Sequence, residues 1–243
     1  MLNRLVQVTR QLRAERNGTR ITLLKTLANS AHSDSLANKL RRRRFELFRA
    51  LVSTLPRPLK ILDVGGTEAF WRQMGFSEEL GVTIVILNIA AVRVTARNFT
   101  AVLGDARRMS AFGNQAFDVV FSNSVIEHVG SYNDQAQMAG EICRVGKRYF
   151  VQTPNRFFPI EPHFLFPFFQ FLPESFQALL VSHFALGWYR RATSRTAALE
   201  AVRSVRLLTE RELRELFPGS SLWRERLVGL TKSFIVYGGW DLL

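Results

Sequence analysis

The chain has 243 residues, of which 47% are hydrophobic and 22% charged, and its formal net charge is +13. This length suits one α/β domain with an insertion, and the composition excludes an extensively disordered chain. A single cysteine, Cys143, excludes an internal disulfide and any cysteine-rich metal site. The basic excess favours a polyanionic neighbour such as nucleic acid or anionic lipid headgroups.

Residues 1–34 show no sustained helical or strand period, and we interpret them as an N-terminal basic extension. They contain no continuous apolar stretch of signal-peptide length. The longest uncharged apolar stretch, 162–173, contains three prolines and is too short to cross a bilayer. We therefore expect a cytoplasmic protein, with peripheral contact to the inner face of the membrane as a further expectation.

The basic residues gather in two places. Residues 41–44 form a run of four arginines, and the second cluster comprises Arg190, Arg191, Arg195, Arg203 and Arg206. The first run lies within a predicted helix at 35–53, whose apolar residues recur at near-helical spacing and which stops before Pro56. Two interpretations stay open: solvated helix faces, or a surface that binds a polyanion.

From residue 59 the chain alternates between strand-like and helix-like segments. This pattern predicts a parallel sheet with helices on both faces, joined by right-handed crossovers. Ligands of such open sheets bind outside the carboxyl ends of the strands. The predicted strands are 59–64, 82–87, 100–103, 117–121 and 148–152, and the predicted helices are 68–74, 91–97 and 134–145.

The alternation stops after residue 152. Residues 155–190 are rich in phenylalanine and proline, which indicates an insertion that covers the site or forms core of its own. A helix is predicted at 209–217, with Thr209 as N-cap and Glu212 completing a capping box. Residues 221–227 and 233–240 then alternate like a hairpin of strands.

The segment Lys60-Ile-Leu-Asp-Val-Gly-Gly-Thr67 is an apolar strand that ends in an acid and two glycines. Gly65 and Gly66 let the backbone approach a ligand closely, and Asp63 can orient an amino group or a water molecule of that ligand.

Four motifs together resemble the class I, seven-stranded S-adenosylmethionine-dependent methyltransferases. The family's first motif, Asp-x-Gly-x-Gly-x-Gly, is similar to the turn after Asp63. Leu103-Gly-Asp-Ala-Arg107 resembles the end of the third strand. Residues 117–129 resemble the fourth-strand signature, and 234–239 the last strand. The resemblance covers residues 60–152 and 209–240.

This resemblance implies an α/β, Rossmann-like, doubly wound and mostly parallel sheet of order 3-2-1-4-5-7-6, with the last strand antiparallel. It implies one domain at 35–243 with an insertion at about 155–205, and S-adenosyl-L-methionine as cofactor. In the family, the carboxylate matching Asp105 accepts from the adenine amino group, and the next backbone amide, here Ala106, meets the ring. The implied cofactor-binding residues are Asp63, Gly65, Gly66, Asn88, Asp105, Ala106 and Asn123.

The chain departs from the family pattern at several positions. Thr67 and Ala69 stand where the second and third glycines usually lie. Asn88 replaces the acid that grips the ribose hydroxyls, so it offers no charge-assisted hydrogen bond, and we expect modest cofactor affinity. Some relatives bind a divalent metal through Glu-x-x-Glu-His. Ser124 replaces the first carboxylate of that pattern, so we expect no metal.

Methyl transfer chiefly needs alignment of the reactants, but a hydroxyl acceptor benefits from a general base. His128 and His163 are the candidates. The segment 153–163 resembles that of a bacterial methyltransferase subset, some members of which have a glycan, lipid or natural-product context. We therefore expect methylation of an oxygen atom on a small-molecule, glycan or lipid-linked acceptor. The alternatives are an RNA methyltransferase and a non-catalytic, methyltransferase-like interaction protein.

Overall fold

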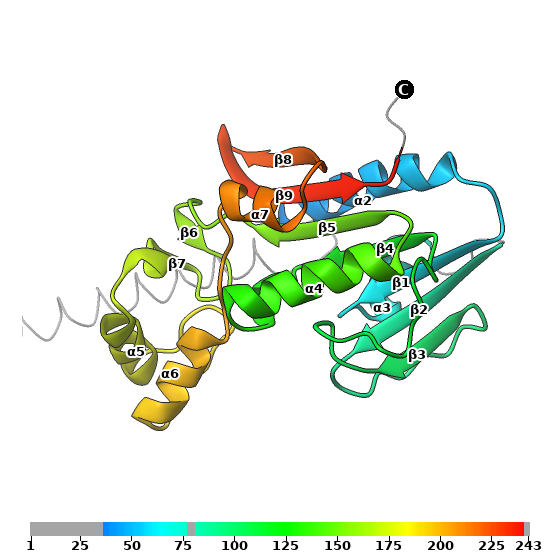
Figure 1. Cartoon of the computed structure of the whole chain (residues 1–243). Coiled ribbons are helices and arrows are strands. Elements are labelled where there is room, and N and C mark those ends of the chain that lie inside the picture. Colours follow the sequence, from blue (N-terminus) through cyan, green and yellow to red (C-terminus); the bar gives the residue numbers. More distant parts are fainter. Residues whose placement is uncertain (1–35, 77–80, 241–243) are drawn as a thin grey trace, which may run out of the picture. The chain divides into compact units, whose positions relative to one another are not determined.

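The computed structural model describes residues 36–76 and 81–240 (Figure 1). The chain divides into two compact units: Arg44–Phe158 with the residues from Glu200 onward, and Pro159–Leu199 with the residues before Arg44. We call them the larger and the smaller unit. The extension expected at 1–34 lies outside the described residues. The expected single domain with an insertion at 155–205 stays a prediction.

The larger unit is built on a seven-stranded sheet of order β3-β2-β1-β4-β5-β9-β8. The first five strands are parallel, and β9 runs antiparallel to both β5 and β8. Because β8 and β9 are the sixth and seventh strands of this sheet, the predicted order and the antiparallel last strand are confirmed. The strands are β1 (Leu59–Val64), β2 (Val82–Asn88), β3 (Phe99–Leu103), β4 (Val119–Asn123), β5 (Tyr149–Pro154), β8 (Ser221–Leu227) and β9 (Leu230–Gly238).

Apolar cores form on both faces of this sheet. One contains Met138 and Ile142 of α4 (Tyr132–Val145) together with residues of α7 (Glu210–Leu216). Figure 1 shows α4 lying along the sheet. The other core joins α3 (Glu68–Gln73) to α2 (Leu36–Ser53) through Phe48 and Trp71. Helices therefore cover both faces, as the alternating pattern predicted.

Aromatic rings dominate the second core. Phe121 of β4 stacks on Phe150 of β5 with ring centroids 5.7 Å apart, and Phe48 of α2 meets Phe121 edge-on at 4.9 Å. Phe48 and Phe150 are 0% and 1% exposed. The helix that precedes the first strand is thus held to the sheet by buried aromatic area and by favourable ring geometry.

Local capping explains where two helices begin. The Thr209 hydroxyl accepts from the Glu212 backbone at 3.2 Å, and the Glu212 carboxylate accepts from the Thr209 backbone at 2.8 Å, so the predicted capping box of α7 is confirmed. Ser131 and Asp134 form a second capping box, which starts α4 two residues before the predicted position.

The helix predicted at 91–97 is wrong, because this segment is irregular. The buried carboxylate of Glu68, on α3, accepts hydrogen bonds from the backbone and the hydroxyl of Thr95. Val92, Val94 and Thr95 are also β-branched, which lowers helix propensity. A partner distant in sequence thus outweighs the weak local period.

The smaller unit contains most of the phenylalanine-rich segment. Its elements are a two-stranded antiparallel sheet of β6 (Ile160–Glu161) and β7 (Phe166–Pro167), the short helix η2 (Phe169–Phe171) and the helix α5 (Glu174–His183). Helix α6 (Arg195–Arg203) follows. The ring of Phe164 stacks on Phe169 at 4.2 Å and on Tyr189 at 4.5 Å. Some of the aromatic residues therefore form core within this unit.

Within residues 36–76 and 81–240, no helix combines the length and the apolar character that a bilayer crossing requires.

Candidate functional site

The structure brings the predicted cofactor residues to one edge of the larger unit. They lie at, or directly after, the carboxyl ends of four strands that are neighbours in the order β3-β2-β1-β4. The parallel register pairs Asp63 of β1 with Phe121 of β4, and Asn88 of β2 with Leu103 of β3. Because the strands end at similar heights, the turns after them share one edge, where open α/β sheets bind ligands.

The turn after β1 requires both of its glycines. Gly65 has φ +77°, and its N–H donates to a carbonyl of β2 at 2.7 Å. A Cβ atom on Gly66 would lie 1.7 Å from Oδ2 of Asp63. Thr67, where the family has a further glycine, is the N-cap of α3, and its side chain accepts from the helix backbone. The departure at Thr67 therefore stabilises the start of this helix.

Asp63 lies beneath this turn and is only 1% exposed. The indole N–H of Trp71 donates to its Oδ2 at 2.6 Å. Burial raises the pKa of the Asp63 carboxyl to about 7, although the Trp71 hydrogen bond acts in the opposite direction. Asp63 thus shapes the turn, and its expected contact with an amino group or water of the ligand stays a prediction.

Asn88 is half-buried at the end of β2. Its Nδ2 donates to the Gly66 carbonyl at 3.4 Å, and its Oδ1 accepts from the Ala90 backbone at 3.3 Å. Next to it, Ile89 is 75% exposed and Leu103 is 69% exposed. Sequence reasoning missed this apolar surface. The sequence did contain a signal for this surface, because the apolar residue Ile89 directly follows the last residue of the buried strand β2.

Asp105 is held by an arginine that sequence reasoning did not assign. The Arg107 backbone donates to Oδ1 at 2.8 Å, and its guanidinium donates to Oδ2 at 2.6 Å and to Asp134 at 2.9 Å. These bonds lower the pKa of the Asp105 carboxyl, so this side chain is an ionised acceptor at neutral pH. Ala106 lies between the two paired residues.

Asn123, at the end of β4, meets a buried arginine. Arg44 of α2 donates from Nη1 to Oδ1 of Asn123 at 3.1 Å, and its Nε lies 3.0 Å from a Glu225 carboxylate oxygen. The Arg44 side chain is 10% exposed. The interpretation of residues 41–44 as a wholly solvated run is therefore wrong at Arg44. In the second basic cluster, Arg206 donates to the carboxylate of Glu212.

The turn after β4 contains the 3₁₀ helix η1 (Ile126–His128). Glu127 is fully buried and accepts from the Thr153 hydroxyl at 3.0 Å. His128 is exposed, and its Nδ1 lies 3.1 Å from the Ser204 carbonyl oxygen. Because a carbonyl can only accept, this contact assigns the proton to Nδ1 and makes Nε2 the basic nitrogen.

In the smaller unit, His163 pairs with Glu161. Nδ1 of His163 lies 2.7 Å from one carboxylate oxygen, and the other oxygen accepts from the backbone of His163 at 2.8 Å and of Phe164 at 2.6 Å. Glu161 is 2% exposed. The carboxylate therefore fixes the imidazole ring and again makes Nε2 the basic nitrogen.

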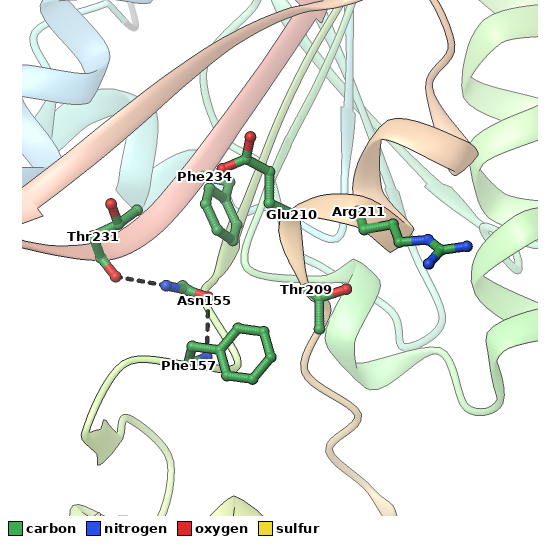
Figure 2. A pocket seen from close by; sticks show the side chains of 7 residues that line it. All are labelled: Asn155, Phe157, Thr209, Glu210, Arg211, Thr231 and Phe234. Carbon is green, nitrogen blue, oxygen red and sulfur yellow. Dashed lines mark hydrogen bonds between the residues drawn. The ribbon is translucent and has the colours of Figure 1, made fainter.

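A cavity of about 400 Å³ opens where β5 ends and β9 begins (Figure 2). Asn155 turns its polar atoms to the backbone: Nδ2 donates to the Thr231 carbonyl at 2.8 Å, and Oδ1 accepts from the Phe157 backbone at 3.0 Å. The rings of Phe157 and Phe234 supply apolar lining. Sequence reasoning missed this cavity, because its walls come from separate segments. It is lined by Asn155, Phe157, Thr209, Glu210, Arg211, Thr231 and Phe234.

Comparison with known sequences agrees with this geometry. Residues 62–149 match the family described as "Methyltransferase domain". An uncharacterized protein of Mycobacterium tuberculosis is 28% identical over 95 residues, which is 39% of this chain and 30% of that relative. The chain thus matches less than a third of the length of this curated relative.

Solved structures share the fold. A "possible exported protein" from Bordetella parapertussis has a TM-score of 0.50 at 14% identity, over 81% of this chain and 66% of that one. The 1,6-didemethyltoxoflavin-N1-methyltransferase from Burkholderia thailandensis has a TM-score of 0.48 at 16% identity, over 78% and 74%. At these identities the similarity concerns the fold alone.

The strand order and the glycine turn after β1 define a Rossmann-like α/β domain. Within it, residues 62–149 match the methyltransferase-domain family. The assignment of individual residues to the cofactor, and the expected absence of a metal, stay predictions.

The raised pKa of Asp63 predicts a pH-dependent stability. An unfolded aspartate ionises near pH 3.9, whereas the folded group keeps its proton up to about pH 7. Its contribution to the free energy of unfolding is therefore full below about pH 4 and falls by on the order of 4 kcal/mol as the pH rises to about 7. We expect Asp63→Asn to lack this decline in urea unfolding measured across this pH range.

Asp118→Asn is the control, because Lys147 and the Lys60 backbone lower the pKa of Asp118 despite its partial burial. That variant should keep the decline between pH 4 and 7. An Asp63→Asn variant with the same pH dependence as the wild type would show that Asp63 is not protonated in the folded state.

Proposed function

We propose that the protein transfers a methyl group from S-adenosyl-L-methionine to an oxygen atom of a small-molecule, glycan or lipid-linked acceptor. The Glu161–His163 pair is the observation that favours oxygen as the atom that receives the methyl group. A hydroxyl group is a weak nucleophile near neutral pH, and a positioned base that takes its proton accelerates its attack. His163, oriented by a buried carboxylate at 2.7 Å, has the arrangement of such a base.

The residues at the carboxyl edge of the larger unit fit the cofactor. Gly65 and Gly66 carry no side chains, so a ligand can approach the backbone of the turn after β1 closely. Asp105 offers an ionised acceptor for an amino group, Asn88 offers an amide for hydroxyls, and exposed Ile89 and Leu103 offer apolar surface for a planar base. When bound, the cofactor supplies an electrophilic methyl group on a sulfonium.

The cofactor assignment predicts that Asp105→Ala weakens binding of S-adenosylhomocysteine, measured by calorimetric titration. Loss of a hydrogen bond to a carboxylate should cost about 1.5 to 3 kcal/mol, or about ten- to a hundredfold in Kd. Asp118→Ala is the matched control, since Asp118 is also ion-paired but precedes β4. Equal affinities of the two variants would show that the adenine does not bind at Asp105.

The base assignment predicts that His163→Ala lowers turnover by about 10² to 10⁴-fold on a hydroxyl acceptor and leaves S-adenosylhomocysteine affinity unchanged. The acceptor is found first by measuring S-adenosylhomocysteine release with phenols, sugars and polyprenols. His128→Ala should lower both turnover and affinity, because His128 follows the cofactor-side strand. His183→Ala, in the same unit as His163, is the control. If His163→Ala kept full turnover, His163 would not be the base, and that role would belong to His128 or to no residue.

We also propose peripheral contact with an anionic membrane surface, because the smaller unit has both exposed large apolar side chains and exposed arginines. Such a mixture suits an interface of acyl chains and anionic headgroups. A lipid-linked acceptor would lie at that interface. The exposed apolar residues are Phe168, Phe171, Phe176, Leu179, Phe184 and Trp188, and the exposed arginines are Arg190, Arg191 and Arg195.

Membrane contact predicts co-sedimentation with phosphatidylglycerol vesicles, weakened by added salt and absent with pure phosphatidylcholine. The double variant Phe176→Ser/Phe184→Ser should reduce the bound fraction. Val228→Ser/Leu230→Ser, at positions of the larger unit that are also exposed, should not. Preference for structured RNA at matched salt would favour an RNA methyltransferase, and binding to neither would remove the polyanion interpretation. Absence of cofactor binding would favour a non-catalytic interaction protein.

A further inference from the structure

The contact between Arg44 and Asn123 determines which atom of the amide faces the arginine. The two ends of an asparagine amide look alike in shape, and only their hydrogen-bond partners distinguish them. A guanidinium group can donate but never accept. The Asn123 atom that lies 3.1 Å from Nη1 of Arg44 is therefore the oxygen, and the amide nitrogen is turned away from Arg44.

The other end of this amide is available to a ligand. Asn123 is half-buried at the carboxyl end of β4, and in residues 36–76 and 81–240 its Nδ2 has no hydrogen-bond partner. An amide nitrogen carries two N–H donors and no acceptor. A group that binds there must offer an acceptor oxygen.

We infer that Arg44 is a positioning residue that makes Asn123 a pure donor, and that these donors bind the carboxylate at the amino-acid end of the cofactor. This inference rests on the proposed function. Neither the glycine turn nor the assignment of Asp105 implies it, because both concern other parts of the ligand.

The strand order supports the choice of the carboxylate. Adenine is assigned to Asp105 at the end of β3, and the ribose to Asn88 at the end of β2. In the order β3-β2-β1-β4, the remaining end of the cofactor extends toward β1 and β4, where Asn123 lies. That end carries the carboxylate, which is the strongest acceptor in this part of the molecule. The positive charge of Arg44, directly behind the amide, adds to the attraction.

Arg44 is held rigidly enough for this role. Its Nε lies 3.0 Å from Oε1 of Glu225, whose Oε2 accepts from the Ser233 hydroxyl at 2.7 Å and lies 3.6 Å from Nζ of Lys232. Glu225 is 1% exposed. Burial lowers the pKa of Arg44, and the charges of Glu225 and Glu127 oppose this effect. With opposite charges fixed on one side, the guanidinium has one stable direction in which to present Nη1.

The test compares two ligands that differ at one end. S-adenosylhomocysteine has the amino-acid end, whereas 5′-methylthioadenosine lacks it. In Asn123→Asp the carboxylate still accepts from Arg44, so the fold is preserved, but both donors are lost and a negative charge faces the ligand carboxylate. We expect calorimetry to give a Kd for S-adenosylhomocysteine raised about ten- to a hundredfold. The Kd for 5′-methylthioadenosine should stay within about twofold, because this ligand has no group that meets Asn123.

The chain contains a matched control. Asn114 also accepts through Oδ1 from an arginine, Arg144, at 3.1 Å, but it is exposed and precedes β4. Asn114→Asp makes the same chemical change in the same kind of pair. It should leave both dissociation constants unchanged.

The role of Arg44 itself is tested in a variant that leaves no buried charge without its partner. Arg44→Met alone would leave the Glu225 carboxylate buried without its main partner, and the protein could unfold. The double variant Arg44→Met/Glu225→Gln removes both charges. Because its Asn123 amide can rotate freely, S-adenosylhomocysteine binding should weaken about three- to tenfold with 5′-methylthioadenosine binding unchanged. A thermal melt checks the fold.

The outcomes separate this inference from the proposed function. No binding of either ligand to the wild type would overturn both. Wild-type binding with an unchanged affinity of Asn123→Asp for S-adenosylhomocysteine would overturn the inference alone. So would an equal loss of both ligands, because Asn123 would then act on the nucleoside or on the fold.

Discussion

The packing of the Asp63 carboxyl group against Gly66 is the constraint on which the candidate site depends. Oδ2 occupies space that any side chain at position 66 would need, and the Trp71 indole holds it there at 2.6 Å. The turn after β1 is therefore tied at once to its own strand and to α3. A backbone fixed in this way presents the same surface to every ligand, so little entropy is lost when one binds.

A second constraint joins the helix before the sheet to the strand beside this turn. The buried network of Arg44, Glu225 and Asn123 crosses from α2 to β4 and β8. Buried ion pairs seldom add much net stability, since both charges must leave water. Here the ion pair fixes the orientation of an amide. The guanidinium of Arg44 can only donate, so it decides which hydrogen bonds the amide of Asn123 can make. Part of the basic excess is thus used inside the protein rather than for a polyanion.

The two compact units divide the chemistry of the proposed reaction. The larger unit contains the edge that fits the cofactor, built from the ends of four parallel strands. The smaller unit contains the oriented Glu161–His163 pair and most of the exposed aromatic side chains. This division suits the phenylalanine-rich segment, which interrupts the chain after β5.

The sequence alone determined the features that depend on neighbouring residues. The alternation of segments predicted a parallel sheet with helices on both faces, and the resemblance to a known family implied the strand order. The start of α7 followed from Thr209 and Glu212, three residues apart, and the glycine turn from consecutive residues. Only the tertiary structure decided the features whose partners are remote. Residues 91–97 are irregular because Glu68, 27 residues from Thr95, binds their backbone. Arg44 is buried through contacts with Asn123 and Glu225, and Asn123 lies 79 residues away in the sequence. Propensity and spacing describe local free energies, whereas such contacts form only after the sheet has brought distant segments together.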